Sequence, residues 1–95
     1  MKIIITESFQ EKLEKQVIFI AADSPSRSRK FKNDVISAIR KILPKPYKHR
    51  QSIYFNDSCI RDLIFKGYTV VFRINQDKDV IEVFGFVKYQ EKLTE

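Results

Sequence analysis

Three strand-length segments separated only by short turns fill the second half of the chain, and this arrangement constrains the fold more than any other feature. Residues 60–65 and 68–74 flank the dipeptide Lys66-Gly67, which is typical of a tight turn. The polar stretch 75–79 then leads to a third apolar segment, residues 80–88. Because turns this short join neighbouring strands of opposite direction, the sequence predicts an antiparallel meander.

Alternation of side chains assigns each strand residue to one of two faces. Symmetry about the first turn predicts that Arg61 lies near Phe72 and Asp62 near position 71. In the last strand, one predicted face contains Ile81, Val83, Gly85 and Val87, and the other contains Val80, Glu82, Phe84, Phe86 and Lys88. Arg73 is expected on the open face, where Arg61 and Lys88 join it as an anion site. In a second interpretation Arg61 pairs with Asp62 or Glu82, or donates to carbonyls at the edge of the sheet.

The first half of the chain is predicted to contain a short strand and two helices. Residues 2–6 are typical of a strand, and Ser8 with Glu11 matches a capping box, so a helix is expected from there to about Ala22. Ser24 followed by a proline predicts a second helix start. This helix carries the apolar stripe Phe31, Val35, Ala38, Ile39 and Ile42, and Pro44 and Pro46 end it.

The connecting segment, residues 45–59, has no helical period and is expected to contain a short extended piece at 52–55. The resulting order is β-α-α-β-β-β. It predicts one α+β domain over residues 1–95, in which a helical hairpin covers one face of a mostly antiparallel sheet.

Positive charge is concentrated in the middle of the chain. The formal net charge is +6, but residues 27–50 contain nine lysines and arginines against one acid, Asp34. Such a segment indicates an anionic partner, either nucleic acid or an acidic protein segment, although a solvated helix face explains it equally simply. The candidate partner- or anion-binding residues are Arg27, Lys30, Arg40, Lys41, Lys48, Arg50, Arg61 and Arg73.

Several classes of function receive no support from the sequence. The single cysteine, Cys59, permits no internal disulfide and favours a cytoplasmic location. No His/Cys metal spacing and no glycine-rich phosphate loop occur, so we expect neither a metal nor a cofactor. No apolar run is long enough to span a membrane or to serve as a signal peptide, so no membrane partner is expected.

A set of candidate catalytic residues for RNA cleavage can nevertheless be named. His49 is the one histidine, and its basic neighbours are expected to lower its pKa and leave it neutral near pH 7, as a general base requires. Arg61, Arg73 and Lys88 are candidates for stabilising phosphate charge, and Tyr89 is a candidate for stacking on a base. The simpler interpretation makes His49 an ordinary loop histidine.

The stretches "IAADSPSRSRKF", "IRDLIFKGYTVVFRI" and "VIEVFGFVKYQ", in this order and spacing, resemble the RelE/ParE toxin superfamily of bacterial type II toxin–antitoxin systems. The resemblance extends from Met1 to about Leu93. It implies a toxin that a cognate antitoxin wraps and neutralises, and a complex that reaches operator DNA only through the antitoxin. RelE-like members cleave messenger RNA on the ribosome, whereas ParE-like members poison DNA gyrase.

Departures from the RelE-like pattern favour the ParE-like branch. Thr69 stands where that pattern has a basic residue after "GY", Arg61 and Asp62 replace its paired lysines, and Lys88 is followed by Tyr89 and Gln90 rather than by another base. Three hypotheses follow: a gyrase-binding toxin, a ribosome-dependent endoribonuclease, and an inactive basic binding domain of the same fold. The antitoxin is expected to be acidic and to dock across the helical hairpin and the adjacent sheet face.

Overall fold

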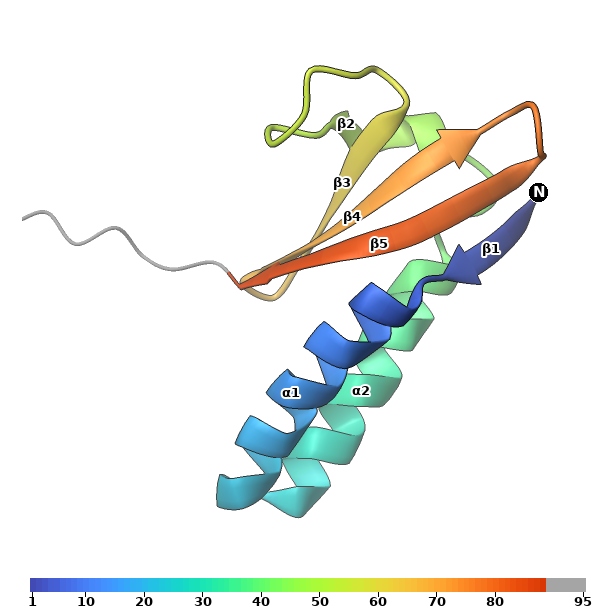
Figure 1. Ribbon diagram of the computed structural model, residues 1–95. Helices are drawn as coiled ribbons and strands as arrows, with labels where there is room; N and C mark the ends of the chain where they lie inside the picture. Colours follow the sequence, from blue (N-terminus) through green and yellow to red (C-terminus); the bar gives the residue numbers. More distant parts are fainter. Residues whose placement is uncertain (89–95) are drawn as a thin grey trace, which may run out of the picture.

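The computed structural model describes residues 1–88 and has the predicted α+β architecture (Figure 1). The elements are β1 (Lys2–Ile5), α1 (Glu7–Asp23), α2 (Pro25–Arg40), a short 3₁₀ turn η1 (Pro46–Lys48), β2 (Arg50–Gln51), β3 (Ile60–Phe65), β4 (Tyr68–Asn75) and β5 (Val80–Lys88). The strand order in the sheet is β1-β5-β4-β3-β2, with β1 parallel to β5 and every other pair antiparallel. None of the helices within residues 1–88 has the length and apolar character needed to cross a membrane.

Helix α1 begins two residues earlier than the capping-box pattern predicted. Thr6, not Ser8, is the N-cap, and its hydroxyl oxygen accepts from the Phe9 backbone N at 3.2 Å. Thr6 also donates its own backbone N–H to the Val83 carbonyl at 3.0 Å. Because that bond keeps Thr6 in extended geometry at the end of β1, the helix starts directly after it.

Helix α2 starts as predicted. Ser24 caps it by accepting from the Arg27 backbone N at 3.2 Å, and Pro25 occupies the first helical position. The Ser24 backbone N–H also donates to Ile20 at 2.9 Å and so closes α1. One residue therefore ends one helix and begins the next, which produces a hairpin with almost no loop.

The predicted hairpin between β3 and β4 is confirmed in register, with Arg61 opposite Phe72 and Asp62 opposite Val71. Lys66 and Gly67 both have positive φ, 46° and 84°, as a two-residue turn that matches strand twist requires. The extended piece expected at 52–55 lies instead at Arg50–Gln51, where it pairs with β3. The chain leaves the sheet after it because the Ile53 backbone N donates to the Asp62 side chain rather than to a strand.

A β-bulge makes the predicted face assignment wrong for the end of β5. The register shifts between Val71 and Phe72, so that Gly85 lies opposite Val71 and Val83 opposite Phe72. Phe84 is the extra residue, and beyond it the two faces are exchanged. Phe86 consequently packs towards the helices, with its ring 5.4 Å from that of Phe9.

The core lies between the hairpin and one face of the sheet (Figure 1). The helices contribute buried Phe9, Leu13, Val35 and Ile39, the turn after α2 contributes Ile42, and the sheet contributes Val70, Phe72, Ile74, Ile81 and Val83. Figure 1 shows the tip of the hairpin, where α1 ends and α2 begins, projecting beyond the strands. On the helix side of the sheet, a groove remains between α2 and β3.

Candidate functional site

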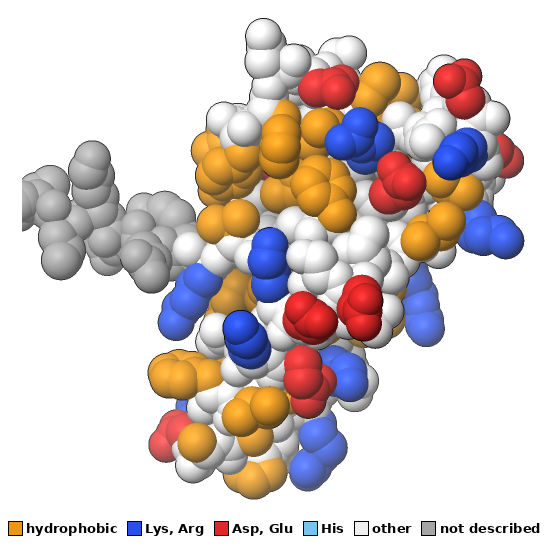
Figure 2. Space-filling view, viewed as in Figure 1, with side chains coloured by type: hydrophobic (Ala, Val, Ile, Leu, Met, Phe, Trp, Pro, Cys, Tyr) orange, Lys and Arg blue, Asp and Glu red, His pale blue; other side chains and the backbone are white. Residues whose placement is uncertain are grey.

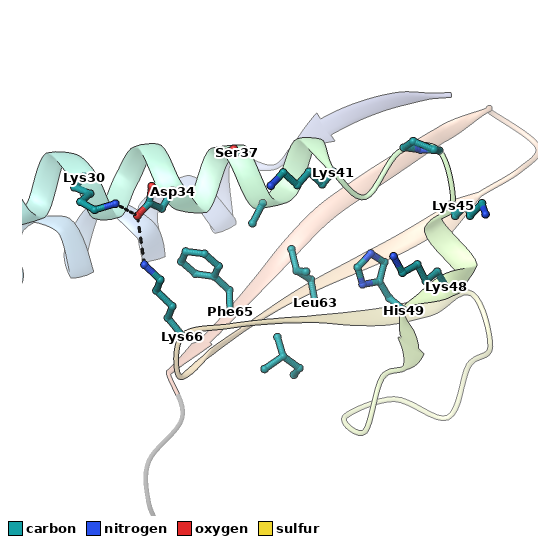
Figure 3. Close-up of a pocket in the computed structure, with 13 residues that line it drawn as sticks. Lys30, Asp34, Ser37, Lys41, Lys45, Lys48, His49, Leu63, Phe65 and Lys66 are labelled. Carbon is teal, nitrogen blue, oxygen red and sulfur yellow. Dashed lines mark hydrogen bonds and ion pairs between the residues drawn. The ribbon is translucent and has the colours of Figure 1, made fainter.

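A groove runs between α2 and β3, and we call it the helix–sheet groove (Figure 3). It has a volume of about 620 Å³, within the range of ligand-binding clefts. Five lysines line it: Lys30, Lys41, Lys45, Lys48 and Lys66. They come from α2, from the segment after α2, and from the β3–β4 turn, so the fold gathers charge that is dispersed in the sequence.

Asp34 is the acid that lines the groove, and two lysines share it (Figure 3). Its Oδ2 atom lies 2.9 Å from Lys30 Nζ and 3.5 Å from Lys66 Nζ. The hydrogen bond from Lys30 is the main cause that lowers the pKa of Asp34, and Lys66 adds to it. This cluster connects α2 to the β3–β4 turn, while Lys41 and Lys48 form no ion pair with any residue in 1–88.

A second hollow continues the groove towards the hairpin tip, and we call it the apolar extension. It has a volume of about 730 Å³ and shares Lys30, Asp34, Phe65 and Lys66 with the groove. Its own walls include Phe19, Ile20 and Phe31. Phe19 is 68% exposed, which is high for an aromatic residue. The combined surface is cationic at one end and apolar at the other.

His49 borders the groove next to Lys48 (Figure 3). Its ring meets Phe72 edge to face, with the centroids 5.6 Å apart. Burial is the main cause that lowers the pKa of His49, and the neighbouring Lys48 charge lowers it further. The imidazole is therefore neutral near pH 7, in the direction expected from the sequence.

Arg61 donates to backbone carbonyls and not to an acid. Its Nε atom donates to Ser58 O at 2.8 Å, and its Nη1 atom donates to His49 O at 2.9 Å. Its guanidinium also lies 5.0 Å from the centre of the Tyr47 ring. These contacts match the structural interpretation of Arg61, because they hold the segment before β3 against the sheet.

Asp62 is paired with Arg50, not with its neighbour in sequence. Its Oδ2 atom accepts from Nε and Nη2 of Arg50 at 3.2 and 3.1 Å, and from the Ile53 backbone N at 3.1 Å. A pair between Arg61 and Asp62 was one predicted option. It is wrong because consecutive residues of a strand point to opposite faces.

The expected anion site of Arg61, Arg73 and Lys88 is not formed. Arg61 lies with Phe72 on the helix side, whereas Arg73 lies on the open face, 3.9 Å from Glu82 and 6.0 Å from the centre of the Phe84 ring. The bulge turns Lys88 back to the helix side, where Nζ lies 5.2 Å from the centre of the Phe19 ring. The last catalytic candidate, Tyr89, lies outside the described residues.

Of the predicted binding residues, Lys30, Lys41 and Lys48 line the groove. The others are distributed elsewhere: Arg27 pairs with Asp23, Arg40 is exposed at the end of α2, and Arg50, Arg61 and Arg73 have the partners given above. Sequence reasoning missed Lys45, Lys66 and the role of Asp34. The four-residue spacing of Lys30 and Asp34 was the available signal for that pair. Among residues 1–88, no cluster of His, Cys, Asp or Glu is suited to hold a metal ion.

Comparison with protein families identifies the family of the chain. The family model described as "ParE toxin of type II toxin-antitoxin system, parDE" matches residues 3–92, which is nearly the whole chain. The chain belongs to the ParE toxin family. It is therefore the toxin component of a type II toxin–antitoxin system, and membership of the ParE family implies an antitoxin partner. No curated protein matches the chain.

Proposed function

We propose that this ParE-family toxin arrests growth by binding DNA gyrase, and that an acidic antitoxin segment neutralises it by occupying the helix–sheet groove. The observation that carries the first part is the dispersal of the candidate catalytic side chains. A nuclease needs a base, an acid and groups that stabilise the phosphorane, all within hydrogen-bonding reach of one phosphate. A toxin that acts by protein contact needs none of these.

The contacts of each candidate support this reading. His49 borders the groove, whereas Arg73 is on the other face of the sheet beside Glu82. The guanidinium donors of Arg61 bind carbonyls. An arginine engaged by backbone oxygens is poorly placed to meet a phosphate, which favours a toxin that acts by protein contact.

The antitoxin part of the proposal rests on charge and on the shape of the groove. Lys41 and Lys48 have no acidic partner among residues 1–88, and they border a cleft that leads into the apolar extension. An acidic segment supplies carboxylates for these lysines and apolar side chains for the surface around Phe19. Binding of a segment with both carboxylates and apolar side chains would combine electrostatic attraction with the burial of apolar surface.

A ribosome-dependent endoribonuclease is the second candidate function, and one specific observation favours it. His49 is neutral near pH 7 and stands beside Lys48 in a cationic cleft. A neutral imidazole can take the proton of a ribose hydroxyl, and nearby lysines can stabilise phosphate charge. This reading requires His49 for toxicity, whereas the gyrase reading does not.

Pulse-labelling after induced expression in a bacterial host separates these functions. DNA synthesis and protein synthesis are followed in one culture for the wild type and for His49→Gln. Under the gyrase reading DNA synthesis falls first in both, and the purified proteins inhibit supercoiling by gyrase equally. An early fall of protein synthesis that His49→Gln abolishes would establish the nuclease instead. If neither synthesis changes while soluble protein accumulates, the chain is an inactive binding domain.

The groove is tested with Lys41→Ser/Lys48→Ser and with the antitoxin encoded in the same operon. We expect the affinity of this variant for the antitoxin to fall by about tenfold or more, and wild-type binding to weaken between about 0.05 and 0.3 M salt. The matched control is Lys2→Ser/Lys78→Ser, which removes the same charge at β1 and the β4–β5 turn. Equal losses in both variants, or binding that is insensitive to salt, would contradict the proposed site.

A further inference from the structure

The loop between β2 and β3 presents three consecutive large apolar side chains to solvent. Ile53, Tyr54 and Phe55 are 67%, 48% and 42% exposed. Isolated exposed apolar residues are common on protein surfaces, but a run of three is unusual unless it binds something. Figure 2 shows hydrophobic side chains gathered on the sheet half of the visible face. The loop is distinct from the groove, because the groove is formed by α2 and the helix side of β3.

The loop is held in place by an unusual internal anchor. The Asp62 side chain is fully buried, and its Oδ2 atom binds both Arg50 and the Ile53 backbone N. Ser52 adds two bonds: its backbone N donates to Ile60 O at 2.8 Å, and its hydroxyl accepts from the Tyr54 backbone N at 3.2 Å. These hydrogen bonds hold the backbone of residues 52–54 in one conformation before a partner binds, which lowers the entropy cost of binding.

Phe55 attaches the end of the run to the sheet. Its ring meets Phe84, the extra residue of the bulge, edge to face at 5.7 Å on the open face. The Tyr54 ring makes no such aromatic contact among residues 1–88. Ile53 and Tyr54 are also more exposed than Phe55. Ile64 lies two residues from Asp62 on the same face of β3 and is 55% exposed, but it lines the helix–sheet groove and is not part of the loop surface.

The charges around the loop are balanced, and this determines the kind of partner. Residues 50–62 contain two arginines and two aspartates, so their formal net charge is zero. Arg50 is paired with Asp62, and on the adjacent face Arg73 lies beside Glu82. Such a surface has no excess of cations for phosphates or anionic lipid. Ile, Tyr and Phe side chains fit an uncharged apolar pocket on a protein, where aromatic residues often supply most of the binding energy.

We infer that Ile53, Tyr54 and Phe55 are the epitope through which this toxin binds its protein target, inserting into an uncharged apolar pocket. The inference deepens the proposed function and rests on the part of it that places toxicity in protein contact. It assigns two partners to two surfaces. The antitoxin takes the cationic groove, and the target takes the neutral loop.

Two matched double variants test this assignment. Ile53→Ser/Tyr54→Ser alters the loop and leaves Phe55 on Phe84, whereas Ile18→Ser/Phe19→Ser alters two equally exposed side chains at the hairpin tip. For each, circular dichroism checks the fold, induced expression measures growth arrest, and titration measures affinity for the operon antitoxin. Inhibition of supercoiling by purified gyrase is measured in parallel, at low and at high salt.

We expect the loop variant to need about tenfold or more protein for growth arrest while its affinity for the antitoxin is unchanged. The hairpin variant should lose antitoxin affinity and keep growth arrest. Inhibition by the wild type should change little with salt, because the epitope is neutral. A folded loop variant that arrests growth as strongly as the wild type would overturn the inference. If the wild type arrests growth without inhibiting gyrase, the proposed target is wrong, and the growth comparison still decides whether the loop is the epitope.

Discussion

The helix–sheet groove and the loop at residues 52–59 lie on opposite sides of β3, and their charges are arranged in opposite ways. Five lysines and one carboxylate, Asp34, line the groove. The segment that contains the loop has equal numbers of acids and bases, and one of its aspartates is buried. In the proposed assignment, attraction over a distance would select the partner for the groove, whereas shape and apolar contact would select the partner for the loop. In the assignment proposed above, the chain would recognise two chemically different partners through two separate surfaces.

The largest loss of stability is expected when the anchor of the loop, the Arg50–Asp62 pair, is removed. Arg50→Ala leaves the buried Asp62 carboxylate without its cation, and we expect unfolding to become easier by about 2 to 3 kcal/mol. This is at the low end for a broken buried pair, because the Arg50 side chain is 47% exposed. Urea unfolding followed by circular dichroism measures the loss. The matched control is Arg40→Ala, an exposed arginine at the end of α2, and equal losses in the two variants would show that Asp62 does not depend on Arg50.

A second test concerns the sheet surface beneath the loop. A Cβ atom added at Gly85 would lie 2.9 Å from Val71 Cβ, so Gly85→Ala must displace a buried side chain. We expect a loss of about 2 kcal/mol in unfolding free energy, as for other overpacked sites. Gly67→Ala is the control. It meets no atom within 4 Å but is strained at φ +84°, and about 1 kcal/mol is expected there. A larger loss for Gly67→Ala than for Gly85→Ala would contradict the packing argument.

A smaller effect is expected in the groove, where it depends on pH. The folded pKa of His49 lies below its ordinary value of 6.5, so just below that pH the unfolded chain binds more protons than the folded protein. Stability is therefore lost as pH falls below 6.5. His49→Gln should flatten this part of the pH profile, which thermal melts at several pH values measure. An unchanged slope would mean that His49 is not buried against Phe72 in solution.

The smallest change in stability is expected from Asp34→Asn. Its ion pairs with Lys30 and Lys66 are solvent-exposed, and such pairs contribute little. Because the folded pKa of Asp34 is lowered, its contribution is present above its ordinary pKa of 3.8 and disappears as pH falls through the folded value. The variant should melt like the wild type near neutral pH but bind the acidic antitoxin more tightly at low salt. Weaker binding in calorimetry would show that Asp34 organises the lysines for the partner.

Most of the fold was predictable from the sequence because its signals are local. Ser24 with Pro25 marks the joint between the helices, and Lys66-Gly67 marks the turn that sets the β3–β4 register. The bulge at Phe84 had a weaker local signal, the isolated glycine at position 85. Both faces of β5 carry apolar side chains, so the alternation pattern does not determine which face is turned to the core at each residue.

The candidate site was less predictable than the fold. The lysines of α2 were identifiable as a basic block, but the contribution of Lys66 depends on where the β3–β4 turn lies relative to α2. The partner of Asp62 is twelve residues away in sequence, and the adjacent Arg61 was the more obvious choice. Local patterns therefore identified one wall of the groove, whereas the opposite wall and the loop anchor arise from tertiary packing.

The position of Asp34 between two lysines also affects the rates at which a partner can associate and dissociate. A carboxylate arriving in the groove can take Lys66 while Lys30 still holds Asp34, so at no stage is a negative charge left without a cation. Departure can follow the same steps in reverse. Because these ion pairs are solvent-exposed, either lysine can be released at little cost in free energy. Under the proposed function, an acidic antitoxin segment would therefore meet no strong ion pair that it must break before it binds.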